Sequence, residues 1–387
     1  MKNHAWGYII AVLCVTFFVG SAAGPVAASS VKAQAASAAP TTAGGKQNWD
    51  SVVAAAKKEG SLSLYALWRP ETRIALTEAF KAKYGIDINF TPFSRGQELL
   101  VKVQTEQRAG LYVADVFGAG GSSLIANMKP AGLLGPMEPL LVLPETTDGK
   151  YWRNGRFPFI DRDKTSVGMI ASLPRYIVYN TNLVKKGEIT TFKDLLKPQY
   201  KGKITVNDPT VSGSGKDCFV NLALNVWNFD EAIAFLSQLI KKQEAAIERD
   251  NRQHVETVAR GKYAIGLGSN PDNLNGLLNV GAPMDAVILK EGVVLTAAAG
   301  CLAVPVKSAH PNAAKLFVNW LLGKEGQTVF ARSFGNPSLR IDVPTEGFNL
   351  LFLPHPEEKI FLDTEESILF SNKMMSAAKQ VIEDANK

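Results

Sequence analysis

The stretch Ser61–Phe93, SLSLYALWRPETRIALTEAFKAKYGIDINFTPF, decides the fold of this chain. Its first residues, Ser61–Leu67, alternate in the way that predicts a strand, and Pro70 then opens a helix that runs to about Lys83. Gly85 ends the helix, and Ile86–Phe93 predict a second strand. A strand, a helix and a strand in this order are typical of a parallel sheet that is covered by its connecting helices.

The alternation continues and then begins a second time. The first run adds a helix over 96–110, a strand over 112–117, a Gly/Ser turn over 118–123 and a helix to Met128. The second run starts near Lys203 and includes strands over 204–206 and 263–267 with three helices between them. The apolar stretch Val293–Val306 contains Gly300 and Pro305, which favour extended chain over a membrane helix. We predict two α/β lobes with mainly parallel sheets, and a strand in 293–306 that returns to the first lobe.

The N-terminus has the pattern of an export signal. Lys2 and His4 precede the apolar run Trp6–Val19, which is too short to span a bilayer and is followed by small residues. We predict a signal peptide over 1–28 and a disordered leader over 29–47, which lacks apolar periodicity. The mature protein is therefore expected in the periplasm or outside the cell.

Composition excludes several classes of protein. The chain has 387 residues, 46% of them hydrophobic and 20% charged, and a formal net charge of +6. The basic residues are dispersed, so nucleic acid is not expected as a partner. The positive balance is consistent with attraction of anionic solutes or with solubility alone. Beyond the signal only Cys218 and Cys301 occur, and they are either two buried thiols or one disulfide.

Catalytic motifs are missing from the sequence. There is no Gly-x-Ser-x-Gly elbow, and Gly213-Ser214-Gly215-Lys216-Asp217 lacks the leading glycine and the hydroxyl of a phosphate loop. The later histidines, His254, His310 and His355, have no metal-site spacing. The acidic pairs at 357–358 and 365–366 are interpreted as a solvated face. We predict no catalytic residue, no metal site and no cofactor.

Polar, glycine-rich or arginine-bearing turns follow several predicted strands, where an open α/β sheet presents its ligand crevice. Backbone N–H groups at the helix starts near 120 and 214 suit a carboxylate or a phosphate. Arg69 and Arg95 can grip an oxyanion bidentately, although each can also be a surface charge, and Trp68 can stack on a ligand or fill the core. The predicted ligand-binding residues are Trp68, Arg69, Arg95, Gly120, Gly121, Ser122, Arg175, Tyr176, Ser212, Arg249 and Asn270.

Several motifs along the chain resemble those of one family. They are Asn48-Trp49-Asp50, Glu98-Leu99-Leu100, Ala114-Asp115-Val116, Val178-Tyr179-Asn180-Thr181, Asp208-Pro209 and the run from His310-Pro311-Asn312 to Leu322. In these the chain resembles the extracellular solute-binding proteins of ABC importers, and specifically the ferric-iron-binding-protein-like branch of the type II periplasmic binding fold.

The resemblance implies two lobes joined by crossing hinge strands, with lobe 1 formed by 48–175 and 302–387 and lobe 2 by 176–301. It further implies a monomer that closes on its ligand about hinges at Tyr176–Asn180 and Thr296–Cys301 and then docks on a permease. Iron-binding members have two adjacent tyrosines where this chain reads Gly268-Ser269-Asn270-Pro271. We therefore expect a small anionic ligand, a carboxylate or a phosphorylated organic molecule.

Three alternatives stay open at this point. The ligand is ferric iron held with a second anion, or the protein reports to a receptor instead of a permease. The third alternative, an exported hydrolase on the same scaffold, needs a nucleophile and a base that the sequence does not display.

Overall fold

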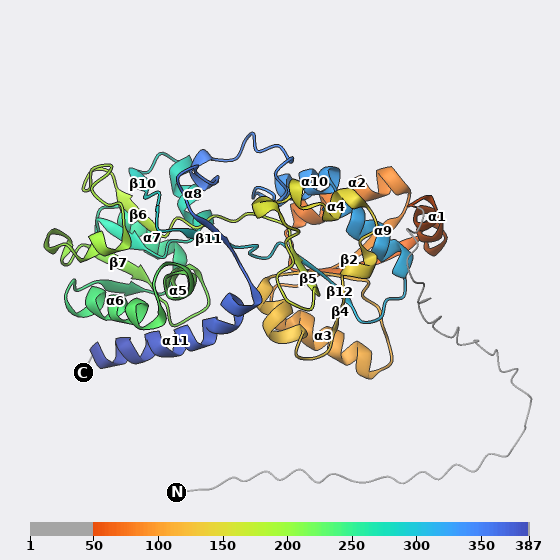
Figure 1. The fold of residues 1–387 in the computed structure, drawn as a ribbon, viewed down its shortest axis with the longest axis horizontal. Coiled ribbons are helices and arrows are strands. Elements are labelled where there is room, and N and C mark those ends of the chain that lie inside the picture. The colour runs from red at the N-terminus through yellow and green to blue at the C-terminus, as the bar shows by residue number, and fades with distance from the viewer. Residues whose placement is uncertain (1–48, 386–387) are drawn as a thin grey trace, which may run out of the picture. The chain divides into compact units, whose positions relative to one another are not determined.

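The computed structural model describes residues 49–385, and the predicted signal peptide and leader lie outside them. Within this range the chain forms two larger mixed sheets and one two-stranded sheet, with helices packed on them (Figure 1). No helix in the described range combines the length and the apolar character that crossing a membrane requires. Cys218 and Cys301 are both buried free thiols, so they do not form the disulfide that the sequence left open.

The first sheet contains the deciding stretch. Its strands, in spatial order, are β2 (Asp87–Pro92), β1 (Ser61–Ala66), β3 (Val116–Ala119), β12 (Cys301–Pro305) and β4 (Leu134–Gly135), and β5 (Ser166–Gly168) also pairs with β12. Strand β1 is parallel to β2 and β3, as predicted. Strand β12 is antiparallel to β3, β4 and β5. The sheet is mixed because the returning strand enters from the opposite direction.

The second sheet has the order β10 (Met284–Ala286), β6 (Ile177–Asn180), β9 (Ile265–Leu267), β7 (Ile204–Asn207) and β8 (Ala246–Glu248). Strand β7 is parallel to β8 and β9, whereas β6 is antiparallel to β9 and β10. The two-stranded sheet joins β11 (Val293–Leu295) to β13 (Ile360–Leu362) in parallel. The predicted return strand is thus divided into β11 and β12 by residues 296–300.

The helices follow the predicted alternation. They are α1 (Trp49–Glu59), α2 (Pro70–Tyr84), α3 (Gly96–Arg108), α4 (Pro144–Thr147), α5 (Ser214–Asn221), α6 (Phe229–Lys241), α7 (Asn251–Ala259), α8 (Pro271–Asn279), α9 (Pro311–Leu322), α10 (Lys324–Phe334) and α11 (Glu365–Ala385), with π-helical segments at Ser122–Met128 and Leu222–Val226. Helix α2 begins at Pro70 and ends at Tyr84. The next residue, Gly85, caps the helix with a φ of 70°, which explains why a glycine stands there. The strand predicted over 112–117 is shorter than expected, because pairing with β1 begins only at Val116.

Two segments of the chain cross between the sheets side by side. Ser172 and Thr296 pair at the crossing: the N–H of Ser172 donates to the carbonyl of Thr296 at 2.9 Å, and the N–H of Thr296 donates back at 3.0 Å. Helix α11 packs on α5 and α6 and also on the segment Ser122–Met128 (Figure 1). The lobe boundaries stay a prediction, and α11 contacts elements on both sides of the proposed division.

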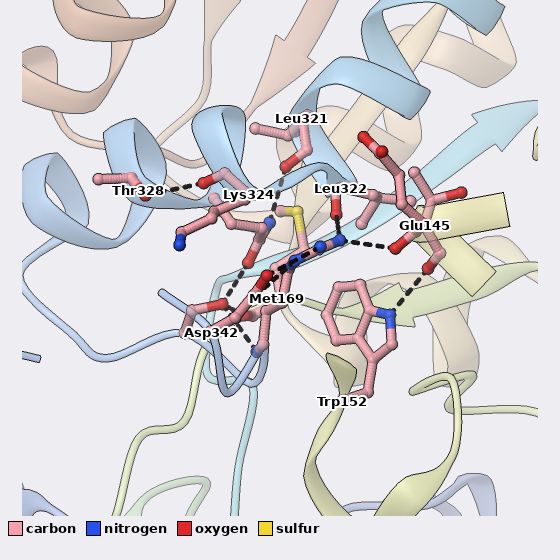
Figure 2. Close-up of polar contacts among 12 residues, drawn as sticks. Glu145, Trp152, Met169, Leu321, Leu322, Lys324, Thr328 and Asp342 are labelled. Carbon is pink, nitrogen blue, oxygen red and sulfur yellow. Dashed lines mark hydrogen bonds and ion pairs between the residues drawn. The ribbon is translucent and has the colours of Figure 1, made fainter. Parts of the chain in front are cut away.

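A buried arginine ties together the end of the first sheet's helical layer. Arg340 Nη1 donates to the carbonyls of Glu145 (2.8 Å) and Leu322 (3.0 Å), while Nε and Nη2 bind the carboxylate of Asp342 at 2.7 and 3.1 Å. Figure 2 shows these contacts, with Glu145 and Leu322 on one side and Asp342 on the other. Only 3% of the Arg340 side chain is exposed, so its donors have no access to water as a substitute.

Replacing Arg340 therefore tests this network. Arg340→Met keeps a long apolar stem but removes every donor, which leaves two buried carbonyls and a carboxylate without their partner. We expect the free energy of unfolding to fall by about 3 kcal/mol. The measurement is urea unfolding followed by tryptophan fluorescence. Arg332→Met, at an exposed position on α10, is the matched control and is expected to change stability by less than about 0.5 kcal/mol. Equal losses in the two variants contradict the assignment.

Candidate functional site

A cavity of about 180 Å³ lies where the crossing segments meet the first turn of α5. Its walls come from the turn after β3, from the two crossing segments, from α5 and from the C-terminal segment. The lining residues are Gly120, Gly121, Ser122, Tyr176, Ser212, Gly213, Lys216, Asp217, Val220, Asn221, Val294, Thr296, Ala298, Asp363, Ser367, Ile368 and Ser371. Elements from both larger sheets and from the C-terminus therefore build one site.

Close backbone approaches shape the walls. A Cβ atom on Gly215 would lie 2.1 Å from the carbonyl oxygen of Asn207, so only glycine lets α5 start this close to β7. The N–H of Gly215 donates to Asn207 Oδ1 at 2.9 Å. On the opposite wall, Ala298 has a φ of 43°, a left-handed conformation that is unfavourable for alanine. The segment 296–300 is therefore held in a strained conformation where it borders the cavity.

Three charged side chains line the cavity. Lys216 Nζ forms an ion pair with Asp217 Oδ1, and it donates to Ser371 Oγ at 3.2 Å. Asp363 accepts a hydrogen bond from Ser367 Oγ at 2.5 Å. The lysine is therefore engaged by one of the two carboxylates, and the cavity as a whole carries one more acid than base.

Burial raises the pKa of Asp363 from its ordinary value to about 6. The nearby charge of Asp217 also raises it, whereas the Ser367 hydrogen bond and Lys216 oppose the shift. Asp363 is half-buried and lines the cavity. Lys216 lies in an ion pair with Asp217, so no ion pair offsets the partial burial of the Asp363 carboxylate among the described residues.

Tyr176 lines the cavity and is only 1% exposed. Within residues 49–385 no group meets hydrogen-bond geometry with its hydroxyl, although the backbone of Val294 lies near it. Burial raises the pKa of Tyr176 well above its ordinary value, so the hydroxyl keeps its proton. A buried hydroxyl without a partner is uncommon in folded proteins.

The structure brings part of the predicted set together. Gly120, Gly121, Ser122, Tyr176 and Ser212 all line the cavity, although they come from segments far apart in the sequence. Their shared feature is a position at a strand end or at the crossing, which is the feature that the prediction used.

The other predicted residues lie elsewhere. Trp68 belongs to the core: its Nε1 donates to the Ala299 carbonyl at 2.9 Å and its ring packs on Phe330. Arg69 forms an exposed contact of 3.5 Å with Asp272. The remaining members do not line the cavity either: Arg95 is exposed before α3, Arg249 pairs with Asp208, Asn270 caps α8, and Arg175 is buried against Glu358 and the carbonyls of Leu351 and Leu353.

The acidic tail was interpreted wrongly. Glu358 is buried in the ion pair with Arg175, and Glu365 binds Lys129 with 2.7 Å between Oε1 and Nζ, so neither is part of a freely solvated face. Sequence reasoning also missed Asp363, Ser367 and Ser371, which lie in or beside this tail. Lys216 and Asp217 were not among the predicted ligand-binding residues, although the helix start near 214 was predicted to face the ligand. Among residues 49–385, no cluster of three or more His, Cys, Asp or Glu is arranged to hold a metal ion.

Solved structures of known proteins share this fold. An iron- and citrate-bound FutA of Trichodesmium matches 84% of this chain and 99% of its own, with a TM-score of 0.64 and 20% identity. AfuA of Actinobacillus pleuropneumoniae, solved with fructose 6-phosphate, matches 84% and 97%, with a TM-score of 0.55 and 20% identity. At this level of identity the likeness shows the fold alone, and it confirms the predicted type II periplasmic-binding fold.

Sequence comparison agrees. A spermidine/putrescine-binding periplasmic protein of Haemophilus influenzae is 25% identical over 306 residues, which cover 76% of this chain and 79% of that protein. The family model for the bacterial extracellular solute-binding protein matches residues 75–348, more than half of the chain. The predicted class, a binding component of an ABC importer, is thereby confirmed. The chain belongs to the bacterial extracellular solute-binding proteins.

Proposed function

We propose that this protein captures a small organic solute in the cavity at the crossing and delivers it, chemically unchanged, to the permease of an ABC importer. The observation that carries the proposal is the composition of the cavity walls. Residues after β3, residues of α5 and residues of both crossing segments meet around one space, and Tyr176, whose hydroxyl has no partner among residues 49–385, is one of its lining residues. A solute bound there contacts residues that are connected to both of the larger sheets.

The proposed mechanism is closure about the crossing. A ligand that touches elements of both sheets favours the arrangement in which all of its contacts are made. Residues near the Ser172–Thr296 pair are suited to be the hinge, since a few backbone angles there can change without disturbing either sheet. Of the predicted hinges, Thr296–Cys301 includes the strained Ala298, which supports this role. Most of Tyr176–Asn180 is strand β6, which is a less suitable hinge.

The side chains that line the cavity bear on the charge of the solute. The related proteins bind dissimilar ligands, a polyamine in one case and iron with citrate or a sugar phosphate in others. The predicted anion relied on arginines, on the helix-start turns and on the missing tyrosine pair. Arg69 and Arg95 do not line the cavity, whereas the turns at 120–122 and 212–213 do. The only cation that does so among the described residues is Lys216, which already binds Asp217 and Ser371. An anionic solute therefore loses the support of the arginines and keeps that of the helix-start turns, and both anions and ferric citrate are included in the test.

The test is a binding screen with a variant that fills the cavity. The purified protein is heated with panels of small amines, carboxylates, sugar phosphates and ferric citrate, and hits are measured by calorimetry. A solute present at 100 times its Kd stabilises the protein by about 2.7 kcal/mol. Ser122 lines the cavity and is exposed to it, so Ser122→Trp is expected to weaken binding by at least about tenfold.

The control is Ser376→Trp, which adds the same bulk at an exposed position of α11 outside the cavity. It is expected to bind as the unmodified protein does. If every solute that binds the protein binds Ser122→Trp equally well, the proposed site is wrong.

A further inference from the structure

We propose that the C-terminal segment 360–371 sets the charge selectivity of the cavity, and that the captured solute carries a protonated amine that binds Asp363. This inference rests on the proposed function, because it names the class of solute for the same cavity. It goes further in assigning specificity to a segment that lies beyond residues 75–348, the range matched by the family model.

The segment is fixed firmly in the wall. Strand β13 pairs in parallel with β11, with Val293 opposite Ile360, and the N–H of Asp363 donates to the Leu295 carbonyl at 3.2 Å. Just before it, the buried ion pair between Glu358 and Arg175 ties the segment to the crossing. Asp363, Ser367, Ile368 and Ser371 then face the cavity together. The carboxylate is therefore held by backbone pairing on one side and by helix α11 on the other.

The charged side chains that line the cavity, one lysine and two aspartates, favour a solute with a positive charge. Lys216 forms its ion pair with Asp217 and acts on Asp363 only at longer range, so among the described residues Asp363 is the carboxylate of the cavity without an ion pair. Taking a carboxylate out of water costs several kcal/mol unless an opposite charge and hydrogen bonds replace the water. A protonated amine supplies both, since an ammonium group has three donors and one positive charge. An added anion makes the imbalance larger.

The start of α5 does not favour an anionic solute over an amine. A helix N-terminus attracts anions, and Gly213 gives α5 no side-chain cap. Asp217, however, lies in the first turn of α5 and already places a negative charge there. The hydroxyl of Tyr176, which has no partner among the described residues, can accept a hydrogen bond from an ammonium group as well as donate one.

The volume limits the solute to a small molecule. The cavity of about 180 Å³ has room for a small organic molecule. A four-carbon diamine is of this size, and the matching diol and dicarboxylate have the same chain length with different charge. These three compounds, butane-1,4-diamine, butane-1,4-diol and butanedioate, make charge the variable that the binding experiment compares.

The ligand-free protein should already show the unsatisfied carboxylate. The groups that face Asp363 are Asp217 and Lys216 of α5, Tyr176 at the crossing and Cys301 of β12. Because the pKa of Asp363 in the folded state, about 6, is above its unfolded value, its effect on stability is lost as the pH rises through about 6. We expect the melting temperature of the protein to fall relative to that of Asp363→Asn between about pH 4 and pH 7. Parallel profiles contradict an unsatisfied carboxylate.

The closing experiment measures binding of the three compounds by calorimetry at pH 7.5 to the unmodified protein, Asp363→Asn, Glu366→Gln and Ser122→Trp. The diamine is expected to bind the unmodified protein at least about tenfold more tightly than the diol or the dicarboxylate. Asp363→Asn keeps an acceptor for Ser367 and should fold, yet it is expected to lose at least about tenfold in affinity for the diamine. Glu366→Gln removes an equal charge at an exposed position three residues away and is expected to bind like the unmodified protein.

Two kinds of failure are distinguishable. If the dicarboxylate or the diol binds more tightly than the diamine and Ser122→Trp abolishes that binding, the amine inference is overturned while the proposed function stands. The inference is also overturned if none of the three binds, or if Asp363→Asn and Glu366→Gln bind the diamine equally well. If the diamine binds and Ser122→Trp has no effect on it, both the inference and the proposed site fall.

Discussion

The pair of backbone hydrogen bonds between Ser172 and Thr296 is the constraint on which the rest of the structure depends. The chain leaves the first sheet after β5 and returns to it as β12. These two passages are joined by this pair and, nearer the sheet, by a hydrogen bond of 2.9 Å from the N–H of Met169 to the Gly300 carbonyl. Because the chain returns in the opposite direction, β12 pairs antiparallel with β3 and β5, and the first sheet is mixed. The cavity lies beside this joint because the crossing brings the ends of both larger sheets together.

The C-terminal segment adds a third passage to the same place. Strand β13 pairs with β11 in the crossing, and the buried ion pair between Arg175 and Glu358 also holds the segment there. The N–H of Asp363 donates to the Leu295 carbonyl, which fixes the backbone of this residue beside the cavity. The raised pKa of this carboxylate is thus a consequence of the fold and is maintained by it.

Local patterns predicted the elements well because strands and helices depend on neighbours in sequence. Alternation and the caps Pro70 and Gly85 identified β1, α2 and β2 to within about a residue or two. The cavity was predicted only in part, because which acid of the tail is buried depends on contacts over long separations. Arg175 and Glu358 are 183 residues apart, and nothing local distinguishes Glu358 or Asp363 from the exposed Glu366.

The arginines illustrate a physical reason why charge alone is a poor guide to a binding site. A buried guanidinium must find acceptors within the protein, and Arg175 binds a carboxylate and two carbonyls. Once these contacts are made, it has little to offer a ligand. Tyr176 and Asp363 are the opposite case: among residues 49–385 the buried Tyr176 hydroxyl has no hydrogen-bond partner, and the half-buried Asp363 carboxylate has hydrogen bonds but no ion pair. Folding has already removed much of the water around these two side chains, so a ligand that binds them does not bear that desolvation cost. Tyr176 and Asp363, and not the arginines, therefore define this site.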